Sequence, residues 1–176
     1  MPNYLMKIYS LFILVTFFLF SACQSKKDSP NEIYPKHVGD ILFDAELDDP
    51  NFKMCSEYRS RQYYNGGTGL NYDGEKKAIL EHFEEYYKSN PLERENGFIT
   101  IRFIVNCERK TGRFRVFSMD MEYQERVFDE RITAQLLKLT KELDGWNFPP
   151  PKRRKLDYYQ YLTFKIESGQ ITEIMP

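Results

Sequence analysis

Cysteine, histidine and paired acidic residues are the side chains of this chain that could carry out chemistry. Cys55 and Cys107 lie neither in a Cys-x-x-Cys motif nor near a histidine at the spacing of zinc ligands. His37 and His82 stand in unrelated contexts, and no serine or cysteine has the setting of a nucleophile. The neighbouring carboxylates fit a charged, solvated surface: Asp48 and Asp49, Asp120 and Glu122, Asp129 and Glu130. We therefore expect no metal, no cofactor and no catalytic residue.

An apolar segment near the amino terminus ends at a third cysteine. Residues Ile8–Ala22 follow Lys7. They are too few for a membrane-spanning helix, which needs roughly 20 apolar residues, but they fit a secretory signal. The tetrapeptide Phe20–Cys23 resembles the lipobox of bacterial lipoproteins. The resemblance implies a signal peptide over 1–22 and acyl chains, palmitate among them, that anchor Cys23 in a membrane. An ordinary cleaved signal and an uncleaved anchor are the alternatives.

Export also decides how the other two cysteines are interpreted. With Cys23 lipidated, Cys55 and Cys107 form an even pair in an oxidising compartment, so a disulfide between them is predicted. Two buried free thiols are the alternative. Loss of residues 1–22 leaves the length of one ordinary domain and removes a single charged residue, Lys7, so the net charge changes from −1 to −2. This balance carries no basic footprint, and no nucleic-acid partner is expected.

Apolar periodicity divides the rest of the chain into a flexible tether, 23–40, and a single domain, 41–176. Apolar residues at helical spacing predict a shorter helix and a long one, at 74–89 and 127–144. Alternating apolar residues and turn residues predict strands at 97–106, 113–119 and 158–167, with a short final strand near 170–174.

The order of these elements indicates the fold class and the sheet topology. A short helix followed by strand, strand, long helix and strand (ββαβ) is typical of an α+β two-layer sandwich, in which the long helix packs on a small antiparallel sheet. The long helix returns the chain along the sheet, so the third strand must lie beside the first. We therefore expect the order second, first, third, with 113–119 and 158–167 as the two edges.

Several segments from residue 63 onward are similar to the C-terminal domain of the TonB family, within the TonB/TolA-type fold. They are GFITIRFIVN, TGRFRVFSMD, the helix that ends at Leu143 before Trp146, and YLTFKIESGQI. The resemblance implies that fold over about 63–176 and binding of partner proteins by strand addition to the last strand. The chain lacks the family's proline-rich spacer, and a lipid would replace the family's uncleaved membrane helix. Energy transduction is therefore not expected.

We expect a lipoprotein of a Gram-negative cell envelope, lipid-anchored in the outer membrane, that acts as a protein-binding or assembly module rather than an enzyme. The expected partner edge is strand 158–167, with Tyr159, Tyr161 and Thr163 on its less buried face. The envelope partner itself is unknown. Coverage of this edge by segment 41–56 is the alternative.

A second function remains open at this point. An envelope enzyme, or an inhibitor of one, could use the loops at 63–73 and 107–112. An enzyme requires a concave pocket with convergent polar groups, whereas a binding module requires an exposed strand edge or an apolar patch.

Overall fold

The computed structural model describes residues 40–56, 60, 70–89, 94–148 and 156–175, all within the compact unit His37–Pro176. The predicted signal peptide at 1–22, Cys23 and nearly all of the tether lie outside the described residues. Most of the loop at 63–73 does as well.

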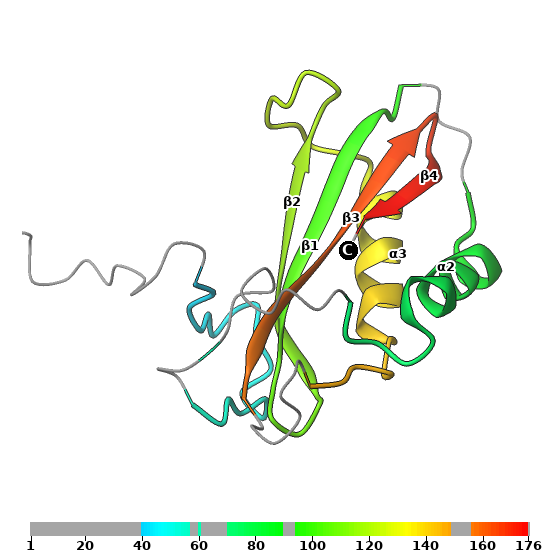
Figure 1. The fold of residues 1–176 in the computed structure, drawn as a ribbon. Coiled ribbons are helices and arrows are strands. Elements are labelled where there is room, and N and C mark those ends of the chain that lie inside the picture. The colour runs from blue at the N-terminus through cyan, green and yellow to red at the C-terminus, as the bar shows by residue number, and fades with distance from the viewer. Residues whose placement is uncertain (1–39, 57–59, 61–69, 90–93, 149–155, 176) are drawn as a thin grey trace, which may run out of the picture. The chain divides into compact units, whose positions relative to one another are not determined.

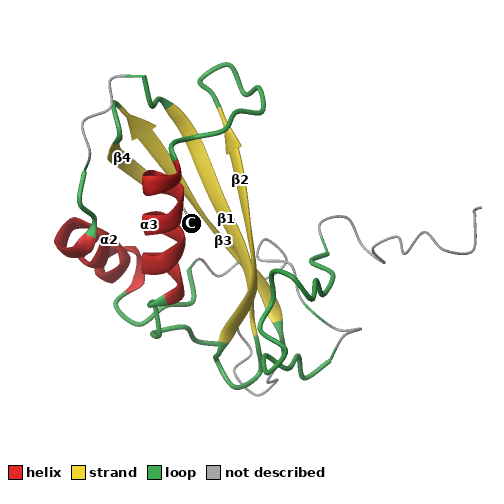
Figure 2. Cartoon of the chain, turned by 180° about the vertical axis from the view of Figure 1, so that it is seen from behind, coloured by secondary structure: helices red, strands yellow, loops and turns green. Residues whose placement is uncertain are grey.

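The described residues form an α+β fold, as the sequence predicts. Its elements are α2 (Glu75–Tyr86), β1 (Gly97–Val105), β2 (Thr111–Met119), α3 (Glu130–Lys141), β3 (Tyr158–Glu167) and β4 (Gln170–Met175). Helix α3 lies across one face of the sheet, and α2 lies beside α3 (Figures 1 and 2).

The four strands form one antiparallel sheet in the order β2-β1-β3-β4. The expectation that β3 is an edge strand is therefore wrong for Thr163–Glu167, because β4 folds back alongside these residues. Among the described residues, no strand pairs with the outer side of β3 at 158–162. The two-residue turn Ser168–Gly169 has φ angles of 52° and 78°. Positive φ at both positions is the backbone of a type I′ turn, whose twist matches that of the flanking strands. This turn returns the chain directly onto the outer side of β3.

The core lies between the sheet and the helices. Alternating residues of β1 face the helices, and apolar residues of α3 at helical spacing face the sheet. Its members include Ile99, Ile101, Phe103, Val105, Ile132, Leu136, Leu139, Trp146, Leu162 and Phe164. Full burial of one such side chain is worth about 1.5–3 kcal/mol. These contacts fix α3 against β1 and thereby set its distance from the neighbouring strand β2.

Helix α3 begins three residues later than the sequence pattern suggests, at Glu130 rather than at residue 127. Asp129 has an extended backbone, and its side chain accepts a hydrogen bond from the backbone N–H of Arg131, so it is the N-cap. Phe128 precedes the cap and is buried against the core. Val127 therefore lies in the connection that leads from β2 to the helix, where it is 91% exposed.

Segment 40–56 covers part of the sheet face opposite the helices. Ile41 packs with Ile104 and Tyr159, and Phe52 and Met54 pack against that cluster. Among the described residues this segment has no strand pairing with β3, and its apolar contact with β3 is the packing of Ile41 on Tyr159.

Two polar contacts of Arg115 hold the covering segment in place. Asp48, whose side chain is almost fully buried, forms a bidentate ion pair with Arg115 of β2, with N–O distances of 2.7 and 2.8 Å. The guanidinium of Arg115 also donates to the carbonyl of Leu42. Hydrogen bonding to Arg115 lowers the pKa of Asp48, so the pair is charged at neutral pH.

The predicted disulfide is present. Cys55 and Cys107 are bonded, with their Cα atoms 5.9 Å apart, and they join the covering segment to the turn between β1 and β2. The fully buried carboxylate of Asp157 accepts hydrogen bonds from the backbone N–H groups of Ser56 (2.7 Å) and Cys107 (2.9 Å). The disulfide and the carboxylate therefore fix the same junction.

Candidate functional site

The residues predicted to bind a partner lie on β3, whose outer side is paired with β4 only from Thr163 onward. Tyr159 is buried under the covering segment, and this burial raises its pKa to about 12. Tyr161 and Thr163 are half-buried, and β4 pairs with β3 from Thr163 to Glu167. Tyr159 is thus not on an open face, and the role of Tyr161 and Thr163 in binding stays a prediction.

The outermost strands of the sheet are β2 and β4, and β4 covers β3 only from Thr163 to Glu167. Each edge faces a helix across a groove: α3 flanks β2, and α2 flanks β4. A strand edge beside a helix is a recurrent site for extended peptides, because the edge supplies backbone hydrogen bonds and the helix supplies side-chain contacts. We therefore compare these two grooves as candidate sites.

The outer side of β2 is only partly occupied. After the turn that follows Met119, the chain runs back for a short stretch, with Glu125 opposite Met119. The backbone N–H of Arg126 donates to the carbonyl of Ser118 at 3.1 Å, and the hydroxyl of Ser118 donates to the carbonyl of Arg126. The carbonyl of Ser118 thus points away from β1. Backbone direction repeats every second residue, so the backbone groups of Val116 and Phe114 point outward too.

Along the described chain, no strand pairs with this outer side below Ser118. A β-bulge interrupts the lower end of β2, where the register with β1 shifts and Arg113 has a φ of 54°. A bulge twists an edge strand and limits the length over which another strand can pair. The open part of the edge is therefore centred on Phe114, Arg115 and Val116.

A groove runs along this edge between β2 and α3. Its upper part has a volume of about 830 Å³ and lies between Val116, Val127, Ala134 and Leu137, among other residues. Its lower part, about 560 Å³, shares Val116 and Leu137 and extends to Leu47 and Lys141. The shared residues make the two parts one continuous surface.

Large exposed apolar side chains are concentrated along the β2 edge. Five of them line or border the groove: Leu47, Val116, Phe117, Tyr123 and Val127. Val116 faces the helix side of the sheet, whereas the next residue of β2, Phe117, faces the opposite side along the same edge. Exposures of 51% for Phe117 and 91% for Val127 are far above those of core residues. Apolar side chains gathered in one exposed strip mark interaction surfaces, whereas scattered ones do not.

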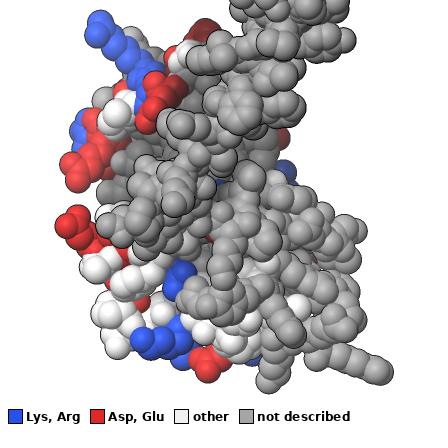
Figure 3. All heavy atoms as spheres, turned by 90° about the vertical axis from the view of Figure 1, so that its left-hand side faces the viewer, with Lys and Arg blue, Asp and Glu red and all other residues white. Residues whose placement is uncertain are grey.

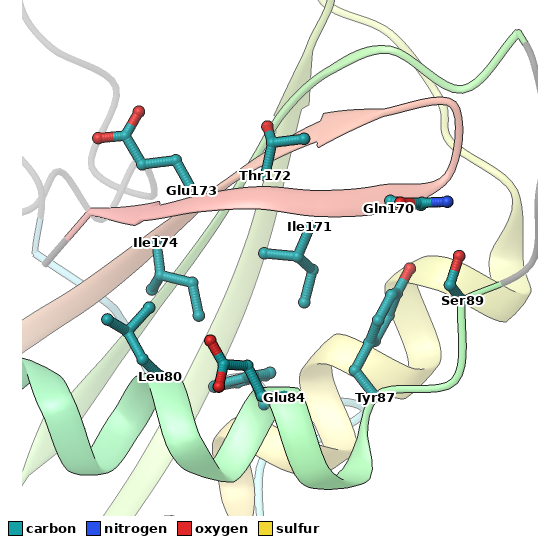
Figure 4. Close-up of a pocket in the computed structure, with 10 residues that line it drawn as sticks. Leu80, Glu84, Tyr87, Ser89, Gln170, Ile171, Thr172, Glu173 and Ile174 are labelled. Atoms are coloured by element: carbon teal, nitrogen blue, oxygen red, sulfur yellow. The ribbon is translucent and has the colours of Figure 1, made fainter.

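The β4 edge has a different character. The cavity between β4 and α2 is smaller, about 250 Å³. Ile171 and Ile174 point from β4 toward Leu80 on α2, while Thr172 and Glu173 point to the other side (Figure 4). The two isoleucines are partly or fully buried, so little apolar surface of β4 is left exposed.

The α2 side of this small cavity is closed by polar contacts. The hydroxyl of Tyr87 donates to the carbonyl of Gly169 at 2.9 Å, and burial raises the pKa of Tyr87 to about 12. The phenol is thus a neutral donor at physiological pH. It fastens the end of α2 to the β3–β4 turn, so the cavity is braced by the fold.

Charged side chains of both signs lie near the β2 groove. Where Figure 3 shows described side chains, cationic and anionic groups are interspersed. Glu125 and Glu130 lie at the upper end of the β2 groove, and Lys141 lies at its lower end, 5.4 Å from the ring of Phe114. The two ends of the groove therefore differ in sign.

The described residues bring together one group of potential metal ligands. The sulfurs of Cys55 and Cys107 and a carboxylate oxygen of Asp157 lie within 4.8 Å of one another. Both sulfurs are bonded to each other, and a disulfide is not the thiolate ligand that a metal needs. Both carboxylate oxygens already accept backbone hydrogen bonds. This group therefore fits a structural junction and not a metal centre.

The loops proposed for an enzyme have structural roles where they are described. In the turn after β1, the side chain of Asn106 accepts hydrogen bonds from the backbone of Glu108 and Lys110. At the end of the other loop, Tyr72 packs edge-on against Trp146 with ring centroids 4.9 Å apart. These contacts shape turns and seal the core; they do not form a pocket with convergent polar groups.

No family model, no curated protein and no solved structure matches this chain. Neither helix within the described ranges is long and apolar enough to cross a membrane. A functional assignment therefore depends on the site's geometry and on the sequence.

Proposed function

We propose that this chain is a lipid-anchored lipoprotein of the bacterial cell envelope whose folded domain binds other envelope proteins. The lipid on Cys23 holds the domain at a membrane surface, and the domain supplies the recognition surface. The domain acts as a binding or assembly module and does not transduce energy, because a lipid anchor cannot collect force from a membrane motor.

The observation that carries this proposal is the concentration of exposed apolar side chains along the β2 edge. Exposed apolar area is costly and promotes aggregation, so the concentration of side chains such as Phe117 and Val127 along one edge favours a partner that covers them. The same strip borders an unpaired strand edge. Edge strands without a partner are normally shortened, charged or covered.

The polar architecture supports binding rather than catalysis. The buried carboxylates of Asp48 and Asp157 are both engaged, one by Arg115 and one by backbone N–H groups. They hold the covering segment and do not face an open cavity. A general acid or base must reach a substrate, and these two groups cannot do so without breaking the fold.

Site-specific photo-crosslinking tests the proposal. A photoreactive amino acid replaces Phe117 or Val127 in the full-length chain, produced in cells and irradiated there. We expect crosslinked adducts to other envelope proteins at these two positions. A matched control places the same group at Glu81, which is well exposed on α2 and outside both grooves. Adducts no more abundant at Phe117 and Val127 than at Glu81 would contradict the proposal.

The anchor is tested separately. The Cys23→Ala variant should lose incorporation of labelled palmitate and should no longer partition into the detergent phase. If the processed variant still partitions with membranes, the lipoprotein part of the proposal is wrong, whereas the crosslinking result concerns the binding part alone.

A further inference from the structure

We propose that the groove between β2 and α3 takes an extended segment of a different protein, which adds to β2 as an antiparallel strand. This inference rests on the proposed function and specifies its mode. It assigns the partner surface to β2, at the opposite end of the strand order from strand 158–167, which the sequence indicates.

The backbone of β2 fixes where the added strand would lie. The short return of the chain at 124–126 already occupies the position of a next strand beside Ser118 and Met119, and it runs antiparallel to β2. The chain then leaves toward α3, and no described strand occupies the same position beside Val116 and Phe114. The carbonyl of Phe114 accepts a hydrogen bond from the guanidinium of Arg115 at 2.8 Å, so an added strand would pair mainly with the N–H of Phe114 and with the N–H and carbonyl of Val116. The bulge at Arg113 ends this stretch. The available edge accommodates about four residues, or roughly 13 Å of extended chain.

The wall of the groove determines which side chains fit. Phe114 and Val116 face the helix side of the sheet, as the stacking of Phe114 on the core residue Phe103 shows. Residues of the added strand opposite these two would face the same way, toward Ala134 and Leu137 of α3. Ala134 is small and exposed, so it leaves room above the helix. The partner segment therefore carries apolar side chains at alternate positions.

For an antiparallel strand, the charges at the two ends of the groove set the order of charged residues in the segment. Glu125 and Glu130 are exposed at the upper end, and neither side chain forms an ion pair with another described residue. Lys141 lies at the lower end. An antiparallel strand runs from Val116 toward Phe114, so its first residues lie near the acidic end. The matching segment is basic, then apolar at alternate positions, then acidic.

A second copy of this chain fits the edge poorly. Symmetric pairing centred on Phe114 places Arg113 opposite Arg115 of the second copy, and pairing centred on Arg115 places that residue opposite itself. Pairing centred on Val116 requires Ser118, whose carbonyl is already bonded to Arg126. Like charges directly opposite each other destabilise a strand pair. The occupant is therefore a different chain.

The test uses a phage-displayed library of random peptides, selected on the full chain purified in detergent. We expect enriched peptides with apolar residues at alternate positions between a basic and an acidic end. Fluorescence anisotropy with the labelled peptides then measures Kd. Val116→Pro removes an outward N–H, a change that edge strands tolerate, and Ala134→Arg fills the groove from an exposed helix position. Each should weaken binding about tenfold or more, which corresponds to 1.4 kcal/mol.

A matched control variant, amide exchange and a test for dimers distinguish binding in this groove from the other possibilities. Glu84→Arg alters the other groove, on α2, and should leave Kd unchanged. Amide exchange on the wild-type chain should show protection of Phe114 and Val116 on peptide binding, which does not depend on how the variants fold. Peptides that lose affinity with Glu84→Arg but not with Ala134→Arg would overturn the inference and leave the proposed function intact. A library that yields no binder overturns it, as does a concentration-dependent dimer that Ala134→Arg dissociates.

Discussion

The two outermost strands of the sheet, β4 and β2, differ in length and in how much apolar surface they expose. This difference indicates which of them binds a partner. β4 is six residues long, follows a tight turn, and directs Ile171 and Ile174 under the sheet toward α2. β2 is nine residues long and leaves Val116 and Phe117 exposed beside a larger groove. Natural proteins protect edges that have no partner. The protected edge closes the fold, and the unprotected one is the candidate for recognition.

The covering segment adds to this contrast, because it is held at β2, at the β1–β2 turn and at the start of β3, and no described contact holds it to β4. The Asp48–Arg115 ion pair fastens it to β2, the disulfide fastens it to the β1–β2 turn, and Asp157 links it to the start of β3. The β4 side has instead the exposed pair Lys165–Glu167, whose side chains are 30% and 46% exposed. The open edge thus lies next to the most heavily crosslinked part of the domain. A rigid neighbour keeps an open edge in one conformation, which favours specific binding over aggregation.

The largest expected effect comes from removing the disulfide. The double variant Cys55→Ser, Cys107→Ser should lower the free energy of unfolding by about 4 kcal/mol, because the bond closes a loop of 52 residues. Urea unfolding of the oxidised wild type and of the variant measures this difference. Amide exchange should rise in segment 40–56 and in the lower half of β2 more than in β4. Equal changes at the two edges would show that the segment does not stiffen β2 in particular.

The next effect concerns the ion pair. Asp48→Asn removes the charge that balances Arg115 in a largely buried setting and should cost about 2–3 kcal/mol. The matched variant Glu167→Gln breaks the exposed pair beside β4 and should cost less than about 1 kcal/mol. Urea midpoints of both variants compare the two sides directly. Equal losses of stability in the two variants would show that the ion pair beside β2 contributes no more than the exposed pair beside β4.

The pH dependence of stability follows from the same pair. The pKa of Asp48 is lower in the folded protein than in the unfolded chain, mainly because its carboxylate accepts hydrogen bonds from Arg115. Its contribution is therefore complete above the unfolded pKa of about 3.9 and is lost as the pH falls through the lower folded value. The urea midpoint of the wild type should approach that of Asp48→Asn as the pH is reduced from 6 toward 2. A difference between them that stays constant over this range would rule out the ion pair as its source.

Sequence periodicity predicts the elements of this fold well, because alternation along β1 and helical spacing along α3 reflect which side chains face the core. The disulfide is predicted by cysteine number and by export. Periodicity does not predict how deeply a residue is buried. Val116 continues the core-facing alternation of Phe114, yet it is 38% exposed because β2 is the outermost strand. The position of β2 at the edge of the sheet could be predicted from the sequence, but the exposed apolar groove along it could not.

The wrong edge assignment has one physical cause, the number of strands counted in the sheet. The turn Ser168–Gly169 and the strand that follows it are both visible in the sequence. A two-residue turn of this kind requires the two strands to pair, which places β4 outside β3. Asp129 is a similar case: an aspartate just before an acidic helix start is a typical N-cap, but Phe128 fits the apolar spacing and extends the predicted helix too far.

The smallest expected effect tests whether the β3–β4 turn is what closes the second edge. Gly169 has a φ of 78°, where a residue with a Cβ atom is strained by roughly 1–2 kcal/mol, so Gly169→Ala should lower the free energy of unfolding by about 1 kcal/mol. The matched control Ser168→Asn places a residue that tolerates the left-handed region at the neighbouring position and should cause no loss. Amide exchange should rise in β4 and in the half of β3 that pairs with it, from Thr163 to Glu167, while β2 is unchanged. If exchange instead rises equally in β2, the two edges are not independent, and the turn does not protect one edge separately from the other.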